Sequence, residues 1–386
     1  MIVSAFMKRD WPLLVILSSL AGAAPSIRAD EAPVVPTLAL GAAAPDFDLP
    51  GVEGRRYSLK SFAAARVLVV VFTCNHCPTA QAYEERIQKL HDDYAPRGVA
   101  LVAISPNDPK AIRLDELGYT DLSDSFEEMK IRARDKSFTF PYLYDGDTQA
   151  VAHLYGPVAT PHVFVFDQAR ALRFVGRVDD GENPEKIKVQ DTRNAIDALL
   201  EGRPVPVEKT KVFGCSIKWA EKEGWAAEAA KKWAAEEVTV SPIDAAGLGD
   251  VARNDSGKLR LVNVWATWCP PCVVEFPQLV AINRMYRGRA FEVVTVSADP
   301  APLRGDVVKF LTDHQASTRN YAGDADDRPA MRNALDPEWH GEIPHTMLVA
   351  PGGTVLYRTR GAFEPLALKK AIIGYLGRYY HSVAGK

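Results

Sequence analysis

The chain has 386 residues, of which 47% are hydrophobic and 25% charged, and its formal net charge at pH 7 is −3. This composition is that of a globular protein, and the length favours two domains. The small net charge gives no reason to expect nucleic acid or an anionic membrane surface as a partner.

The first 29 residues have the pattern of a secretory signal peptide. Lys8 and Arg9 precede a mainly apolar run from Trp11 to Leu20, and small residues lead to a cleavage site after Ala29. The apolar run is shorter than the roughly 20 residues that span a bilayer, although an uncleaved signal anchor stays open as the alternative. We therefore expect a periplasmic or otherwise exported protein that is soluble after cleavage, with residues 30–39 as a tether.

Residues 40–205 are expected to form a first α/β domain. Apolar runs over 67–73 and 99–105 predict buried strands, with a helix over 78–94 between them. The polar stretch 107–135 predicts one or two short helices. Strands over 162–166 and 172–178 and a helix over 191–200 close this domain.

Residues 206–239 are expected to be a linker that contains an Ala/Lys/Glu-rich helix over 217–237. Its tryptophans, Trp219, Trp225 and Trp233, are expected to pack against one domain. Residues 240–386 repeat the plan of the first domain. The expected strands cover 259–265, 291–297, 346–349 and 355–359, and the expected helices cover 272–287, 306–314, 328–335 and 365–380.

Each half carries one Cys-x-x-Cys motif between an apolar strand and a helix, Cys74-Asn-His-Cys77 and Cys269-Pro-Pro-Cys272. Much later in each half a Pro-His pair, at Pro161 and Pro344, precedes another apolar strand. A strand, a dithiol at a helix start and a distant proline loop make up a thioredoxin-like unit. The predicted fold class is α/β, with two thioredoxin-like domains in tandem, each a central mixed sheet flanked by helices.

The order of the cysteines predicts their roles. Cys74 and Cys269 are the expected nucleophiles, because free N–H groups and the helix dipole at a helix start stabilise a thiolate. Cys77 and Cys272 are then the thiols that resolve a mixed disulfide. The redox-active disulfides are expected to be Cys74–Cys77 and Cys269–Cys272, with no metal and no other cofactor.

The two proline loops are expected to bind the substrate. A cis peptide bond between Thr160 and Pro161, and between Ile343 and Pro344, would place a backbone edge beside the dithiol, where a substrate chain can pair with it. Cis bonds are otherwise rare in proteins.

Residues 240–386 resemble the periplasmic thioredoxin-like reductases associated with cytochrome c maturation, the TlpA/ResA-like group, through the run from Asn263 to Cys272 and through Glu275-Phe-Pro277. In that family a glutamate three residues after the second cysteine is an active-site acid, so the resemblance implies this role for Glu275. The alternative interpretation is a first-turn charge that favours the helix dipole. The resemblance also implies protein thiols and disulfides as partners, with apocytochrome c or a membrane thiol reductant as candidates.

Residues from about 40 to 219 resemble a different branch, the redoxin-like proteins grouped near the peroxiredoxins (AhpC/TSA-like), through residues 72–78, 159–166 and 214–219. His76 is expected to stabilise the Cys74 thiolate and thereby raise the reduction potential of the first site, unless it is merely an exposed polar residue. Cys215 is either a small buried apolar residue, which is the favoured interpretation, or a third redox thiol.

The leading functional hypothesis is an exported thiol–disulfide oxidoreductase that exchanges disulfides with protein partners through both sites, with electrons passing from the second dithiol to the first. One alternative is an antioxidant thiol peroxidase centred on Cys74, which is weakened because Val71 stands where a peroxiredoxin has threonine or serine. Another is a non-enzymatic copper or haem carrier, for which His76 alone offers a ligand beside the thiols.

Overall fold

The computed structural model describes Met1 and residues 35–323 and 328–380. The expected signal peptide over residues 1–29 and the first half of the expected tether lie outside the described residues, apart from Met1. Among the described residues, no helix is both long and apolar enough to cross a membrane.

The first domain is built on a mixed sheet whose strands lie in the order β5-β4-β3-β7-β8. β3 pairs parallel with β4, and β4 parallel with β5, whereas β7 and β8 continue the sheet antiparallel. Every residue of β3 is buried, which explains its unbroken apolar run, because a central strand covered on both faces contacts no water. The strands are β3 (Val67–Phe72), β4 (Val99–Ser105), β5 (Tyr142–Tyr144), β7 (His162–Phe166) and β8 (Leu172–Gly176).

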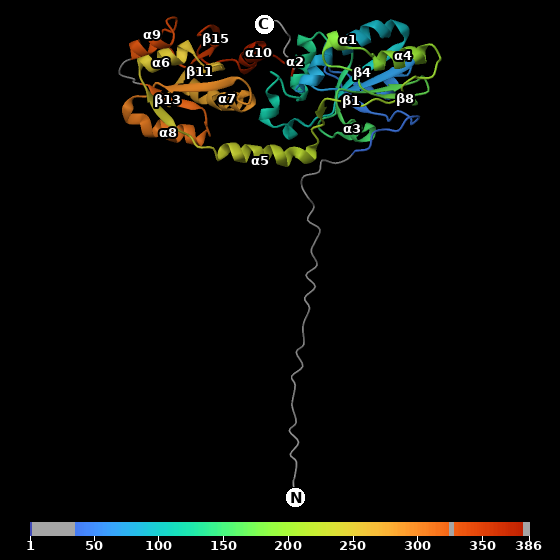
Figure 1. Cartoon of the computed structure of the whole chain (residues 1–386), viewed down its shortest axis with the longest axis horizontal. Coiled ribbons are helices and arrows are strands. Elements are labelled where there is room, and N and C mark those ends of the chain that lie inside the picture. The colour runs from blue at the N-terminus through green and yellow to red at the C-terminus, as the bar shows by residue number, and fades with distance from the viewer. Residues whose placement is uncertain (2–34, 324–327, 381–386) are drawn as a thin grey trace. The chain divides into compact units, whose positions relative to one another are not determined.

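Helices cover both faces of this sheet (Figure 1). Val67, Val69 and Val71 of β3 pack in one core cluster with α1 (Pro78–Tyr94), α2 (Phe126–Asp135) and α4 (Asp191–Leu200). The alternate side chains, Leu68 and Val70, pack on the other face with α3 (Ala150–Tyr155). This alternation follows from the two-residue period of a strand.

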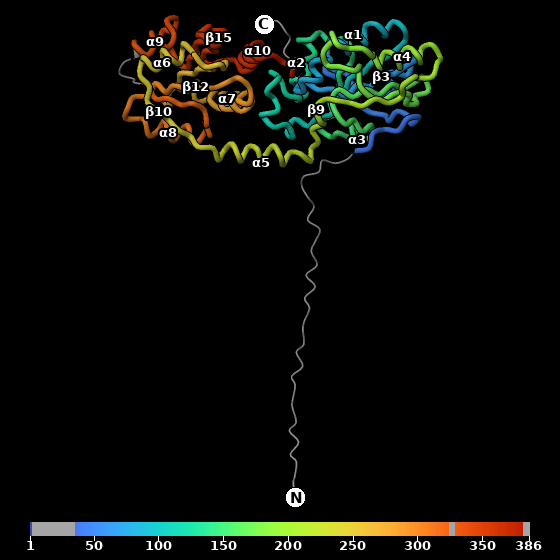
Figure 2. Tube along the Cα trace, in the orientation of Figure 1, coloured from blue at the N-terminus to red at the C-terminus, as the bar shows by residue number. Residues whose placement is uncertain are grey.

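Two small antiparallel pairs complete the first domain, β1 (Asp48–Pro50) with β2 (Arg56–Ser58), and β6 (Ala159–Thr160) with β9 (Cys215–Ser216). β9 comes from the expected linker, yet it lies among the elements of the first domain (Figure 2). The residues after it continue this packing, since Ile217 and Trp219 are buried in the first domain's core. The indole of Trp219 stacks on His153, with 4.6 Å between ring centroids.

The helix expected over residues 217–237 is shorter in the structure. α5 covers Glu223–Ala234, because the residues from 215 to 219 are extended and held by the first domain. Trp219 packs as expected, whereas Trp225 is 38% exposed. Part of the segment expected as a linker, residues 215–219, therefore packs in the first domain.

The second domain has a mixed sheet in the order β10-β13-β12-β11-β14-β15. β10 to β13 run parallel to one another, and β14 and β15 are antiparallel. Helices α7, α8 and α10 pack on the face that carries Leu259 and Leu261, and α6 and α9 pack on the face of Val262 and Val264.

The expected strands and helices of the second domain are present, with ends shifted by up to four residues, whereas β10, β13 and α6 were not expected. The strands are β10 (Val240–Ile243), β11 (Leu259–Trp265), β12 (Phe291–Ser297), β13 (Arg319–Gly323), β14 (His345–Val349) and β15 (Val355–Arg360). The helices are α6 (Ala245–Arg253), α7 (Pro270–Tyr286), α8 (Arg304–Asp313), α9 (Arg328–Leu335) and α10 (Pro365–Leu376). Two tandem thioredoxin-like domains, each a mixed sheet flanked by helices, are thereby confirmed.

Candidate active sites

The first candidate site lies between the end of β3 and the start of α1. Cys74, His76 and Cys77 are all buried, with at most 2% of each residue exposed. Cys77 is the N-cap of α1, and its sulfur accepts a hydrogen bond from Ala80 N at 3.4 Å. The helix therefore begins after the second cysteine, so the expectation that Cys74 lies at the helix start is wrong.

The disulfide of the first site differs from the expected Cys74–Cys77 pair. Cys77 is bonded to Cys215, with their Cα atoms 5.8 Å apart, and Cys74 is a free thiol. The physical reason is β9, which places Cys215 directly opposite Thr160, next to Cys77. The favoured interpretation of Cys215, a simple buried apolar residue, is wrong as well.

The proline loop contacts both cysteines of the first motif. The Thr160–Pro161 peptide bond is cis. Sγ of Cys74 lies 3.2 Å from the hydroxyl of Thr160, and Sγ of Cys77 lies 3.5 Å from the carbonyl oxygen of the same residue. The proline loop thus lies beside the first motif, as expected.

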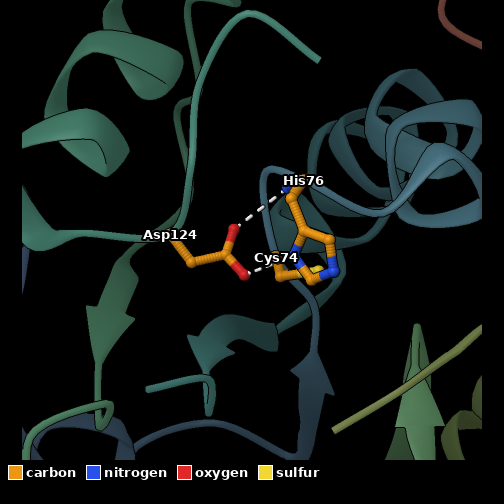
Figure 3. A group of neighbouring side chains, drawn as sticks. All are labelled: Cys74, His76 and Asp124. Carbon is orange, nitrogen blue, oxygen red and sulfur yellow. Dashed lines mark hydrogen bonds and ion pairs between the residues drawn. The ribbon is translucent and has the colours of Figure 1, made fainter. Parts of the chain in front are cut away.

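His76 faces Cys74 and Asp124 in a buried group of three (Figure 3). Its Nδ1 lies 2.6 Å from Oδ2 of Asp124. Burial lowers the pKa of His76, but the negative charges of Asp124 and Cys74 outweigh this effect and raise the pKa to about 10. The imidazolium that results stabilises an anionic sulfur beside it. His76 is thus buried rather than an exposed polar residue.

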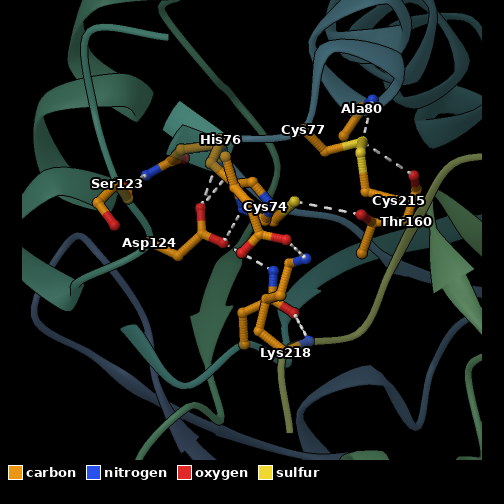
Figure 4. A network of polar contacts seen from close by, with 12 residues as sticks. Cys74, His76, Cys77, Ala80, Ser123, Asp124, Thr160, Cys215 and Lys218 are labelled. Carbon is orange, nitrogen blue, oxygen red and sulfur yellow. Dashed lines mark hydrogen bonds and ion pairs between the residues drawn. A yellow bond between two sulfur atoms is a disulfide. The ribbon is translucent and has the colours of Figure 1, made fainter. Parts of the chain in front are cut away.

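Asp124 holds this group together and was not found from the sequence. Besides His76 Nδ1, its carboxylate accepts the backbone N–H groups of Asn75 at 2.8 Å and His76 at 3.0 Å, and the side-chain amide of Asn107 at 2.7 Å. Burial raises the pKa of Asp124, but the charge of His76 and these hydrogen bonds outweigh it and hold the pKa below its usual value. The oxygen atom Oδ1 of Asn107 in turn accepts Lys218 N at 2.9 Å, which ties the segment after β9 to the same network (Figure 4).

The same group offers three kinds of metal ligand. One atom each from Cys74, His76 and Asp124 lie within 4.8 Å of one another. The four hydrogen bonds to the Asp124 carboxylate use its lone pairs, so a metal ion would have to displace some of them. The geometry therefore fits an ion pair with a thiolate better than a metal centre.

The second candidate site has the expected disulfide, Cys269–Cys272, with 5.3 Å between the Cα atoms. Cys269 is the N-cap of α7, and its sulfur accepts Cys272 N at 3.4 Å. Cys269 is 4% exposed and Cys272 is fully buried. The helix-start position predicted for the first cysteine of the motif is thus found in this domain.

Glu275 lies one turn after Cys272 and points into the domain. Its carboxylate accepts the side-chain amide of Asn263 at 2.9 Å and the backbone N–H of Phe363 at 3.0 Å. Burial raises the pKa of Glu275 to about 7, although both hydrogen bonds act in the opposite direction. A carboxyl that changes charge near neutral pH can accept and return a proton, whereas a solvated helix-start charge would keep an ordinary pKa.

The loop of the second site also contains a cis bond, between Ile343 and Pro344. Ile343 packs against the core cluster that contains both cysteines. It also lines a small apolar pocket with Trp268, Met331 and Trp339, and Trp268 is half exposed. The residue after the proline, His345, is turned to Asp336 at 3.0 Å rather than toward a cysteine.

Each half of the chain is similar to known protein families. Residues 40–175 match the AhpC/TSA family model and residues 245–372 match the Redoxin family model. The thiol:disulfide interchange protein HelX of Rhodobacter capsulatus is 28% identical over 135 residues, which cover 35% of this chain and 70% of HelX. The thiol-disulfide oxidoreductase ResA of Oceanobacillus iheyensis is 27% identical over 34% of this chain and 60% of its own length.

Among solved structures, a hypothetical protein of Sinorhizobium meliloti is 34% identical, covers 48% of this chain and 97% of its own, and has a TM-score of 0.43. The fold and the paired cysteines define a tandem thioredoxin-fold protein. The chain carries two tandem domains, of which the first matches the AhpC/TSA family model and the second the Redoxin family model, and the resemblances expected for its two halves are confirmed.

Proposed function

We propose that the protein is an exported thiol–disulfide oxidoreductase that exchanges disulfides with protein partners at both cysteine sites. The observation that carries the proposal is a duplicated arrangement, in which a Cys-x-x-Cys motif follows a central strand and lies beside a cis-proline loop. The class agrees with relatives that are named thiol:disulfide interchange proteins and thiol-disulfide oxidoreductases.

The second site supplies a complete exchange step. A thiolate of the partner attacks Sγ of Cys269, a mixed disulfide forms, and Cys272 leaves as a thiolate. A second thiol of the partner then attacks the mixed disulfide, so that the partner is oxidised by two electrons and the Cys269/Cys272 pair is reduced. Glu275, with a pKa of about 7, is the proposed proton carrier for the departing Cys272.

Export and the kind of partner are part of the proposal. The leader over residues 1–29 supports export. A protein partner is supported by apolar surface next to Cys269, where Trp268 is 50% and Val274 is 79% exposed. Candidate partners are apocytochrome c and a membrane thiol reductant, and an electron relay between the two domains belongs to the same hypothesis.

Reduction of insulin by the full chain, with dithiothreitol as the electron source, tests the proposal. The double variant Cys269→Ala/Cys272→Ala should lose the larger part of the rate, and Ser256→Ala, away from both motifs, serves as the control. A rate that persists when all four cysteines of the motifs are replaced would reject the oxidoreductase.

A second candidate, a thiol peroxidase centred on Cys74, is favoured by one observation. Cys74 is unpaired and lies beside the His76–Asp124 pair and the hydroxyl of Thr160. Rapid consumption of hydrogen peroxide that disappears in Cys74→Ala but not in Cys269→Ala would select this activity. Stoichiometric Cu(I) binding without disulfide exchange would instead select a metal carrier that uses the same group of side chains.

A further inference from the structure

The segment that carries Cys215 lies tightly against the proline loop of the first site. In the β6–β9 pair, Cys215 is the register partner of Thr160, the residue before the cis-proline. Gly214 makes this approach possible, because its φ is +142° and a Cβ atom there would lie 2.0 Å from the carbonyl oxygen of Thr160. Backbone of the chain itself thus occupies the loop edge at which we expected a substrate chain.

Three sulfur atoms meet at this point (Figure 4). Cys74 and Cys77 form a buried cluster with Ala80, and Cys215 packs against that cluster. Thr160 contacts the Cys74 sulfur through its hydroxyl and the Cys77 sulfur through its carbonyl oxygen, so both sulfurs contact the same residue. The disulfide between Cys77 and Cys215 therefore has a free thiol as its immediate neighbour.

We propose that Cys215 is a third redox thiol of the first site, and that the disulfide moves between two positions, Cys77–Cys215 and Cys74–Cys77. This proposal rests on the proposed function, because it concerns which oxidised form of that site meets a partner. It assigns to the Cys77–Cys215 form the role of a resting state, and to the Cys74–Cys77 form the role of the disulfide that a partner thiol attacks.

The step is an internal exchange that needs no oxidant. The thiolate of Cys74 attacks Sγ of Cys77, the Cys74–Cys77 bond forms, the Cys77–Cys215 bond breaks, and Cys215 leaves as a thiolate. The proton that Cys74 loses on becoming a thiolate goes to solvent, Cys215 takes up a proton from solvent after it leaves, and His76 keeps its own proton throughout. Each side of the reaction contains one disulfide and one thiol, so nothing is oxidised or reduced overall.

The His76 imidazolium has a free Cys74 sulfur beside it only while Cys74 is outside a disulfide, so its charge favours the Cys77–Cys215 form. Asp124 sustains this preference, because it accepts the hydrogen bond from His76 Nδ1 and carries the opposite charge. Removing the imidazole should therefore shift the population toward the Cys74–Cys77 form. A purely structural Cys77–Cys215 bond would show no such response.

Linkage mapping of the oxidised full chain tests the proposal. The protein is incubated at pH 7, quenched in acid, alkylated with N-ethylmaleimide and digested with trypsin. One peptide, residues 67–86, contains Cys74 and Cys77, and another, residues 212–218, contains Cys215. We expect two species: the two peptides joined with Cys74 alkylated, and the first peptide closed on itself with Cys215 alkylated.

The variants decide between exchange and a static bond. His76→Asn should raise the ratio of the second species to the first by about tenfold, the equivalent of one pKa unit. Cys74→Ser should abolish alkylation of Cys215, because nothing can release it. Finding only the joined peptides in the wild type and in His76→Asn, from pH 6 to pH 9, would overturn the proposal.

The mapping uses no substrate, so it is independent of the insulin assay. An active oxidoreductase with a single, fixed linkage would reject the third redox thiol and leave the proposed function standing. Two linkages in a protein without exchange activity would support the third redox thiol and reject the proposed function.

Discussion

His76 and Asp124 form a buried pair in which Nδ1 of the histidine lies 2.6 Å from Oδ2 of the carboxylate. The pair takes over a role that we had assigned to a helix terminus, since α1 starts only after Cys77. In the second domain α7 starts directly after Cys269, and no histidine lies within its motif. The two sites thus stabilise a thiolate by different physical means.

Asp124→Asn should slow the alkylation of Cys74. The raised pKa of His76, about 10, keeps its imidazole charged up to that pH, and removal of the Asp124 charge lowers this pKa. At pH 7 we expect the iodoacetamide rate to fall as the His76 pKa approaches neutrality, because the imidazole then loses the charge that stabilises the thiolate. Mass spectrometry of the Cys74 peptide measures the rate, with the exposed Asp48→Asn as control. Equal rates in the two variants would refute the role of Asp124.

Glu275→Gln should change how both reactivity and stability depend on pH. Because burial raises the folded-state pKa of Glu275 to about 7, the stability linked to its proton is fully present below its unfolded pKa and is lost as pH rises through about 7. The wild type should therefore lose stability relative to the glutamine variant between pH 5 and pH 8. Thermal melts at several pH values measure this difference.

The same substitution should remove an inflection near pH 7 from the rate at which the reduced second site exchanges disulfides. A wild-type profile that is flat around neutrality, or one that the glutamine variant reproduces, would reduce Glu275 to a buried acid without a part in the exchange.

Cys272→Ala should trap a mixed disulfide with a protein substrate, whereas Cys269→Ala should not. Cys269 caps α7 and is the less buried of the two sulfurs, so it is the one that a partner thiol reaches. Non-reducing gels followed by mass spectrometry identify the trapped cysteine. Adducts that accumulate on Cys272 in the Cys269→Ala protein would reverse the assignment.

The Cys74–Cys77 disulfide of the first site should be reduced at a less negative potential than Cys269–Cys272. Opening it frees Cys74 beside the charged His76, and each 1.4 kcal/mol of such stabilisation raises the two-electron potential of that disulfide by about 30 mV. Equilibration of the full chain in a series of glutathione buffers, with each disulfide quantified by mass spectrometry, measures the order. If Cys269–Cys272 opens first, electrons do not run from the second site to the first.

The sequence predicted the fold wherever an element has a strong pattern of its own. The buried strands β3, β4, β11 and β12 and the helices α1 and α4 lie within a residue of the expected bounds, because long apolar runs and clear helical periodicity mark them. The strands β10 and β13 were not expected. β10 is an edge strand that contains Pro242, and β13 has no apolar run, so their pairing depends on tertiary context.

The same distinction separates the site residues that the sequence predicted from those that it did not. The four motif cysteines, Thr160–Pro161 and Ile343–Pro344 could be found because each belongs to a local motif. Asp124 and Asn107 could not, since they lie in a polar stretch and meet His76 only through the fold. The partner of Cys215 depends on the pairing of two strands of two residues each, which carries no signal in a single sequence.

Gly214 has a consequence for how this kind of protein can diversify. A side chain at that position would collide with the Thr160 carbonyl, so an alanine there should push β9 away from β6 and separate Cys215 from Cys77. The cysteine is useful only while its neighbour is glycine. Among natural relatives of the first domain, the two residues should accordingly be gained and lost as a pair, and a library that randomises position 214 should retain the Cys77–Cys215 linkage in glycine-bearing clones alone.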